Sequence, residues 1–367
     1  MRASLVLKVL AEHPDGPALS NDTRTLSASQ VITSIADMSQ RLQGCRVLAV
    51  LADNSTDWII ADLAALNTGI VHLPIPTFFT ADQIINALTQ TGADIVLTDQ
   101  PERITALELG FIAGRTDGSL TLLRRLTPVI PLPLGTAKIS FTSGSTGNPK
   151  GVCLSATGLL ATAQTIQTTL VDLQLSQHLA VLPLTLLLEN SAGIYAALLS
   201  GAQVHVPSLS TLGWRGMAGF DPAALQLAAM RAQAHSLILV PELLKAWAIY
   251  LMATGQRAPS SLRFVAVGGA HVDLALLSRA RQVGIPAFEG YGLTECGSVV
   301  SLNRPGDEGN GVGRVLSHVS SMSARAKCGC KTRPSWDTPA MRPAPQMPRK
   351  TLPQVTSVAW TTEVTCT

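Results

Sequence analysis

Short apolar runs alternate with amphipathic stretches over most of the chain. The runs at 46–51 and 263–267 have the length of buried strands. The stretches at 55–66 and 242–253 are longer, and their patterns predict helices. Strands that alternate with helices of this length indicate βα units and largely parallel sheets, so we expect an α/β fold.

The same pattern predicts further elements up to residue 289. Expected strands are 71–73, 94–97, 138–141, 179–182, 203–206, 236–240 and 286–289, and expected helices are 81–90, 155–169, 187–199, 222–232 and 274–282. Ser55 is the expected N-cap of the helix at 55–66, with Asp57 in its first turn. Residues 101–136 are predicted to be irregular, with several prolines making a linker-like approach to the next strand.

One loop carries the clearest chemical signal. After Phe141 the chain reads Thr-Ser-Gly-Ser-Thr-Gly-Asn-Pro-Lys-Gly. Glycines let backbone N–H groups approach a phosphate, hydroxyls donate hydrogen bonds to its oxygens, and the lysine adds positive charge. The spacing does not fit a Walker A loop. The candidate phosphate-binding residues are Thr142, Ser143, Gly144, Ser145, Thr146, Gly147 and Lys150.

This segment resembles the phosphate loop of the AMP-forming adenylating enzymes, which include acyl-CoA synthetases, nonribosomal-peptide adenylation domains and luciferases. A second stretch, Tyr-Gly-Leu-Thr-Glu at 291–295, agrees with the same family. The resemblance implies that Tyr291 stacks on adenine, Thr294 binds the α-phosphate and Glu295 holds Mg²⁺. It also implies nucleotide contacts from residues of two glycine turns, Gly269, Ala270, Gly290 and Gly292.

The resemblance also implies a reaction and a domain plan. ATP would activate a carboxylic acid to acyl-AMP, and coenzyme A would then accept the acyl group, with Thr294, Glu295 and Lys150 as catalytic residues. Residues 1–320 would form the large N-terminal domain of such ligases, with stacked, largely parallel sheets. We expect one α/β subdomain at 1–130, and a second at 131–320 that holds the phosphate loop and the adenine site.

The segment at 181–190 departs from the common family pattern. Many relatives have an aromatic residue or histidine shortly after Leu-Pro-Leu, where this chain has Leu187, Leu188, Glu189 and Asn190. In the family this region borders the acyl pocket, so an aliphatic lining favours a medium- or long-chain alkyl acid. The leucines at 186–188 fit a plain helix core equally well. The chain is most like fatty acyl-CoA ligases on this reading, and an enzyme that loads a carrier protein is the alternative.

Composition places few further limits on function. Hydrophobic residues make up 46% of the chain, yet no run approaches the roughly twenty apolar residues of a membrane span. The first ten residues make no convincing signal peptide. Cys45, Cys153 and Cys296 are scattered, which suits a reducing cytosol, so we expect a cytoplasmic protein. His72 and the other histidines near apolar strands, at 205 and 235, are expected to be packed rather than catalytic.

The last 46 residues abandon the α/β pattern. From Met322 on, six of the 22 prolines and seven basic residues occur with only two acids, so this tail holds more net positive charge than the whole chain, at +3. Such a tail is typical of nucleic-acid or membrane binding. We favour another interpretation and expect no nucleic-acid partner, because the genetic code offers a test.

The tail can be read in a shifted frame. When the third base of each codon, which the protein sequence leaves partly free, is joined to the first two bases of the next, residues 354–367 can be read as Thr-Gly-Asp-Leu-Gly-Arg-Met-Asp-Asp-Arg-Gly-Tyr-Met-His. This matches the next motif of the family, whose first aspartate binds ribose. The same shift from Ala324 produces the family's preceding motif. We therefore predict a single frame slip near 320–322, with 321–367 an aberrant, disordered tail.

The slip has a functional consequence. The ribose-binding aspartate, the hinge and the small C-terminal domain with its catalytic lysine would be missing in frame. Such a chain is expected to recognise nucleotide weakly, to adenylate poorly and to form no thioester. A non-functional gene product is the third interpretation, beside the acyl-CoA ligase and the carrier-loading enzyme.

Overall fold

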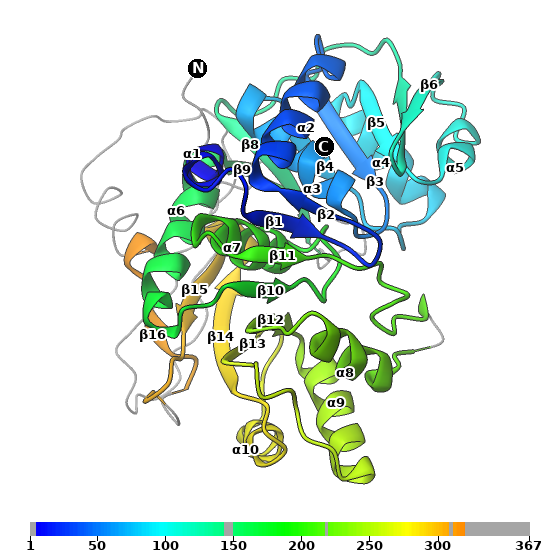
Figure 1. Cartoon of the computed structure of the whole chain (residues 1–367). Coiled ribbons are helices and arrows are strands. Elements are labelled where there is room, and N and C mark those ends of the chain that lie inside the picture. Colours follow the sequence, from blue (N-terminus) through cyan, green and yellow to red (C-terminus); the bar gives the residue numbers. More distant parts are fainter. Residues whose placement is uncertain (1–4, 143–149, 217–218, 308–310, 320–367) are drawn as a thin grey trace, which may run out of the picture.

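The computed structural model describes residues 5–142, 150–216, 219–307 and 311–319. Within them, two sheets lie one above the other in Figure 1, with helices between and outside them. The first sheet has the order β6 (Ile112–Asp117), β7 (Leu120–Arg124), β5 (Ile95–Thr98), β3 (Val47–Leu51), β4 (Val71–Pro74), β8 (Thr136–Thr142) and β9 (Lys150–Ser155).

The second sheet is larger. Its order is β16 (Arg314–Val315), β15 (Ser298–Leu302), β14 (Ala287–Leu293), β13 (Phe264–Val267), β12 (Ser236–Leu239), β10 (Gln177–Leu179), β11 (Gln203–His205), β1 (Pro17–Ser20) and β2 (Thr25–Ser27). The central strands of both sheets run parallel, and antiparallel strands occur at the edges. The predicted α/β fold with largely parallel sheets is confirmed.

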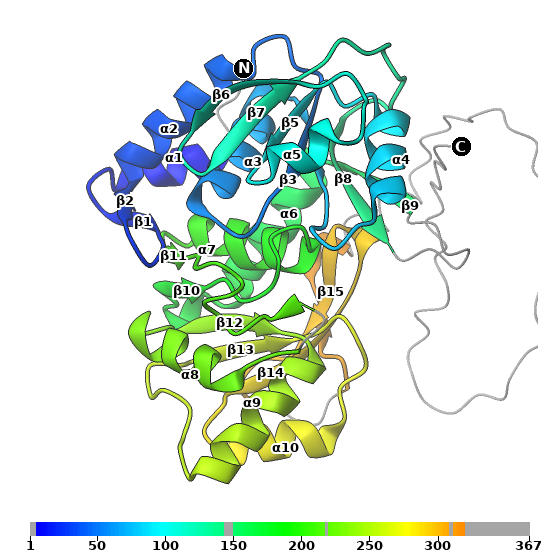
Figure 2. The same ribbon diagram turned by 90° about the vertical axis from the view of Figure 1, so that its right-hand side faces the viewer.

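Helices form layers on both sides of each sheet. The helices are α1 (Leu5–Glu12), α2 (Ala28–Arg41), α3 (Thr56–Thr68), α4 (Ala81–Thr91), α5 (Pro101–Thr105), α6 (Ala156–Thr169), α7 (Ala196–Leu199), α8 (Pro222–Arg231), α9 (Pro241–Thr254) and α10 (Leu274–Gln282), with short turns at η1 (Val171–Leu173) and η4 (Thr294–Cys296) and a π-helix, η2 (Leu188–Tyr195). One core joins α2 and α3 to α6, η2 and α7 between the sheets. Figure 2 shows α8, α9 and α10 on the opposite face of the second sheet.

The sheets exchange strands across the predicted subdomain boundary at 130. β8 and β9 belong to the first sheet, because β8 pairs with β4 through His72 and Lys138. β1 and β2 belong to the second sheet through β11. The strand that leads into the predicted phosphate loop is therefore part of the first sheet. The boundaries of the domains remain a prediction.

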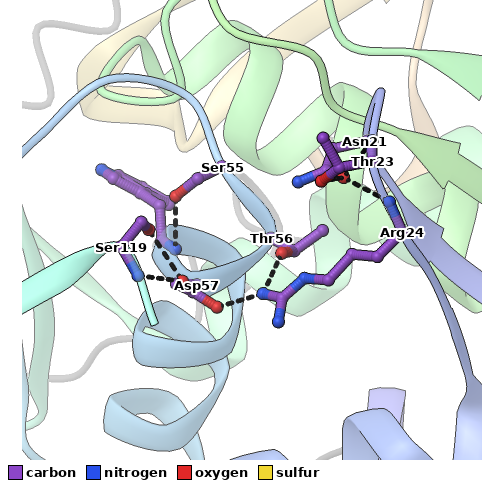
Figure 3. A network of polar contacts seen from close by, with 8 residues as sticks. Asn21, Thr23, Arg24, Ser55, Thr56, Asp57 and Ser119 are labelled. Atoms are coloured by element: carbon purple, nitrogen blue, oxygen red, sulfur yellow. Dashed lines mark hydrogen bonds and ion pairs between the residues drawn. The ribbon is translucent and has the colours of Figure 1, made fainter. Parts of the chain in front are cut away.

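The N-terminus of α3 joins the two sheets. Ser55 caps the helix as predicted, since its hydroxyl accepts from the Trp58 N–H at 3.1 Å. Figure 3 shows Arg24, from the turn between β1 and β2, reaching Thr56 at 2.6 Å and forming an ion pair with Asp57. Burial alone raises the pKa of Asp57, but hydrogen bonds from Ser119 and the charge of Arg24 lower it below its usual value.

Several predicted elements need correction. The region 101–136 is not irregular throughout, because it contains α5, β6 and β7, and β8 begins at its end. Its pattern is weak because β6 is an edge strand whose Ile112 is exposed, while only β7 turns leucines inward. The strand expected at 179–182 lies at 177–179. The helix expected at 187–199 is a π-helix followed by one α-helical turn.

Candidate active site

The phosphate loop is held by an antiparallel hairpin. Thr142 ends β8 and pairs with Lys150 at the start of β9, and the Thr142 hydroxyl donates to the Lys150 carbonyl at 3.4 Å. Five candidate residues of the loop lie outside the described residues: Ser143, Gly144, Ser145, Thr146 and Gly147. β9 lies against η4, so the stem of the loop is beside the second motif.

The second motif lies on β14 and at its end. Gly290, Tyr291, Gly292 and Thr294 line one large cavity, and Gly269 at the end of β13 lines it too. The tight pairing of β14 with β15 requires glycine at one of these positions, because a Cβ on Gly292 would overlap the carbonyl of Ser298 on β15. Five predicted positions are thus brought together.

Two predicted residues lie at the edge of this arrangement. Ala270 and Glu295 are exposed and are not among the residues that line the cavity. Glu295 follows directly after Thr294, which does line the cavity. Within the described residues, no three His, Cys, Asp or Glu side chains form a metal-binding group. A single carboxylate beside a phosphate site is a donor set that suits Mg²⁺, which binds one or two carboxylates together with substrate phosphates and water.

The cavity runs along the parallel strands of the second sheet. It has a volume of about 800 Å³. Its lining includes Gly268, just after β13, and Gly290 in β14. It also includes His178, Ser236 and Phe264, which lie near the amino ends of β10, β12 and β13. A length of four residues of strand corresponds to roughly 13 Å. Most lining side chains are aliphatic, and they include Ile166, Leu170, Leu182, Leu186, Leu187 and Leu188. Leu187 also belongs to the central core and Leu188 packs against it, whereas Leu186 is exposed.

One wall of the cavity contains a buried acid–histidine pair. His178 Nε2 lies 3.0 Å from Glu189 Oε1, and His178 Nδ1 lies 3.0 Å from the Ser236 hydroxyl. The second carboxylate oxygen of Glu189 accepts from the backbone N–H groups of Val181 and Leu182, at 3.2 and 2.9 Å. Both imidazole nitrogens and both carboxylate oxygens are therefore occupied. The pair fastens the start of η2 to β10 and β12.

Residues 7–322 match the family described as AMP-binding enzyme. The chain belongs to this family. This chain is 32% identical over 207 residues to a long-chain-fatty-acid–CoA ligase of Thermus thermophilus, an alignment that covers 56% of this chain and 34% of the relative. It is 25% identical over 304 residues to a feruloyl-CoA synthase of an Amycolatopsis species, which covers 79% and 59%. The chain spans less than two thirds of the length of either relative.

Solved structures support the same fold. The o-succinylbenzoate CoA synthetase of Bacillus subtilis, in complex with ATP and magnesium ion, has a TM-score of 0.66 at 19% identity, over 86% of this chain and 66% of that one. The N-terminal domain of FACL13 from Mycobacterium tuberculosis has a TM-score of 0.69 at 18% identity, over 85% and 81%. The fold of this chain is thus that of the N-terminal domain of such ligases. None of its helices in the described ranges could cross a bilayer.

Sequence reasoning assigned no role to several buried polar residues of this chain. These are Asp62, Lys138, His178, Glu189, Asn190 and Tyr195. A signal was available, because Lys138 stands in an apolar strand and Asp62 in a strongly apolar helix, and a charge in such a position needs a partner. Of the three histidines expected to be packed, His72 is buried, while those at 205 and 235 are partly exposed.

Replacing Gly193 with alanine should disturb the acid–histidine pair. The new Cβ would overlap Glu189 Oε1 and approach His178 Nε2 to 2.8 Å. We expect a loss of about 2 kcal/mol in the free energy of unfolding, the size typical of overpacking. Urea unfolding measures it, with Gly158→Ala in α6 as the control glycine, whose Cβ would meet only the Ser155 hydroxyl at 3.2 Å. Equal stability of the Gly193 variant and the unaltered chain would contradict the expectation.

Proposed function

We propose that this chain carries the nucleotide and acyl sites of an AMP-forming ligase that activates an alkyl carboxylic acid. One observation carries the proposal. The apolar cavity of about 800 Å³ is lined in part by Tyr291, Gly292 and Thr294, the residues that the family resemblance assigns to ATP. An acid held in this cavity would present its carboxylate beside the nucleotide site.

The proposed chemistry follows from Thr294, Glu295 and Tyr291. A carboxylate oxygen attacks the α-phosphorus of ATP, and the bond to the β-phosphate oxygen breaks, leaving acyl-AMP and pyrophosphate. The Thr294 hydroxyl donates to an α-phosphate oxygen and so stabilises the developing charge. Glu295 would hold Mg²⁺, which neutralises phosphate charge when bound. Tyr291 is 44% exposed, so one face of its ring is open for adenine to stack on.

The acid is proposed to be a medium- or long-chain alkyl acid. The leucines and isoleucine of the cavity wall offer apolar area along its whole length, and each methylene buried there contributes about 0.8 kcal/mol. The acceptor is proposed to be the thiol of coenzyme A, which displaces AMP and forms a thioester. A carrier-protein thiol is the alternative, and a frame-restored protein assayed with and without coenzyme A separates the two.

The tail is proposed to be the correct DNA read out of frame. The shifted reading restores two family motifs, and the family match ends at residue 322, where the slip is expected. Residues 320–367 lie outside the described residues. Resequencing the gene through this region tests the proposal directly. If the slip is present in both DNA and protein, an inactive gene product becomes the favoured interpretation.

Binding of stable acyl-adenylate analogues tests the adenylating function in the 367-residue chain. We expect a dodecanoyl sulfamoyl-adenosine to bind at least about tenfold more tightly than its benzoyl counterpart, because the longer chain buries more apolar area. Titration calorimetry measures both. Tyr291→Ala should weaken the binding of both analogues, since it removes the proposed stacking contact with their shared adenine. Tighter binding of the benzoyl analogue would overturn the choice of acid, and no binding of either would overturn the adenylation site.

A further inference from the structure

A π-helix of eight residues forms one wall of the cavity. Leu188, Ala192 and Gly193 of η2 line it. A π-helix of this length is rare, since most are single turns inside α-helices and many lie at functional sites. Something in the structure must therefore favour the i→i+5 register over the α-helical one.

Two residues of η2 that do not line the cavity point to the cause. Asn190 Nδ2 donates to Asp62 Oδ2 at 2.7 Å, and the Tyr195 hydroxyl donates to the same oxygen at 2.8 Å. Asn190 and Tyr195 are five positions apart. In an α-helix such residues point about 140° away from each other, whereas in a π-helix they are neighbours on one face. Their shared contact with one carboxylate thus selects the π register.

The carboxylate of Asp62 is itself fixed by the first sheet. Lys138 Nζ of β8 lies 2.8 Å from Asp62 Oδ1, and His72 Nδ1 of β4 lies 2.5 Å from the same oxygen. Lys138 also donates to Asn190 Oδ1 and, at 3.1 Å, to the Tyr195 hydroxyl. Asp62, Lys138 and His72 are at most 2% exposed. The ammonium and the carboxylate each contact both Asn190 and Tyr195 of η2.

The charges of Asp62 and Lys138 balance within this cluster. Burial alone would raise the pKa of Asp62, but Lys138 and His72 hold it far below its usual value. Burial lowers the pKa of His72, and its Nε2 is buried with no hydrogen-bond partner among the described residues, which agrees with a neutral ring that carries its proton on Nδ1. One carboxylate and one ammonium then balance. None of these three side chains lines the cavity, so the cluster acts through η2 and not on the substrate.

We propose that the Asp62–Lys138 pair is a positioning device that holds η2 in its π-helical register and thereby sets the shape of the acyl cavity. This rests on the proposed function for the identity of the ligand, but not for the register. Removing the extra residue of the π turn would rotate the residues that follow by about 100°. Ala192 and Gly193, the small residues of the wall, would leave the cavity, and the space for the acyl chain would change.

A charge-neutral double variant tests the device. Asp62→Asn with Lys138→Met removes both charges at similar volume, so no buried charge is left alone. In the full 367-residue chain, we expect the preference for a dodecanoyl over a hexanoyl sulfamoyl-adenosine to fall at least about tenfold. Amide hydrogen exchange at 188–195 should also become at least about tenfold faster, because the register is no longer held. Tyr195→Phe, which removes a single hydroxyl, should shift both readouts less and in the same direction.

A matched control separates positioning from general stability. Gln226 accepts from Trp247 Nε1 at 2.9 Å and donates to the Arg257 carbonyl at 3.0 Å, buried between α8 and α9 and away from the cavity. Gln226→Leu should lower the melting temperature and leave both the acyl preference and the exchange at 188–195 unchanged.

Two results would overturn the inference. One is a folded double variant whose exchange at 188–195 and acyl preference equal those of the unaltered chain. The other is an unfolded double variant together with a Tyr195→Phe variant that changes neither readout. If the unaltered chain binds no analogue, the proposed function fails, and the hydrogen exchange still decides the register.

Discussion

A protein translated in the restored frame after residue 320 should form acyl-AMP at least about a hundredfold faster than the 367-residue chain. The shifted reading adds the ribose-binding aspartate, and the family resemblance places a catalytic lysine in the domain beyond it. Removing one group that stabilises transition-state charge costs roughly 10²–10³ in rate. The lysine and the aspartate together should therefore make at least that difference.

Pyrophosphate exchange with dodecanoic acid measures this effect on both proteins. Thr294→Val in the restored protein provides the reference for the loss of one stabilising group. It removes a hydroxyl from the described site and should lower the rate by about 10² without unfolding the chain. Equal exchange rates in the 367-residue and restored proteins would contradict the frame hypothesis. Thioester formation with coenzyme A should appear only in the restored protein.

Replacing Lys138 alone with alanine should destabilise the fold by about 3–5 kcal/mol. The variant leaves the Asp62 carboxylate buried without its ammonium, and a lone buried charge costs that much. Urea unfolding of the 367-residue chain measures the change. Asp62→Asn combined with Lys138→Met should cost far less, since it leaves no unpaired charge.

The free energies of unfolding of these two variants, compared with each other, decide the prediction. If Lys138→Ala is no less stable than the neutral double variant, Lys138 and Asp62 do not form a buried ion pair whose charges depend on each other, and the prediction is wrong. A surface pair provides the reference: Arg215→Ala, which removes the exposed partner of Asp221, should cost at most about 1 kcal/mol.

Local chemistry along the chain accounts for what could be predicted. The helix α3 was placed within two residues because Ser55, a strong N-cap, precedes an apolar stretch. The glycine-rich motifs were recognised because phosphate binding needs small residues and donors in a fixed order. Tyr291 and Thr294 do line one cavity, although their roles toward ATP remain predictions.

The elements that were missed depend on partners distant in sequence. The β6–β7 hairpin has little apolar pattern of its own and is formed by antiparallel pairing with β5. The same holds for the place of β8, which joins the first sheet by pairing with β4.

The sequence by itself determined the α/β class, the family and the order of the nucleotide motifs, because each depends on residues close together in the chain. Only the tertiary structure decided the course of the apolar cavity and the π register of η2. Asp62 and Asn190 are 128 positions apart, and their contact exists only once both sheets have formed. No local propensity encodes such a contact, so a helix that reads as α-helical in the sequence becomes π-helical in the fold.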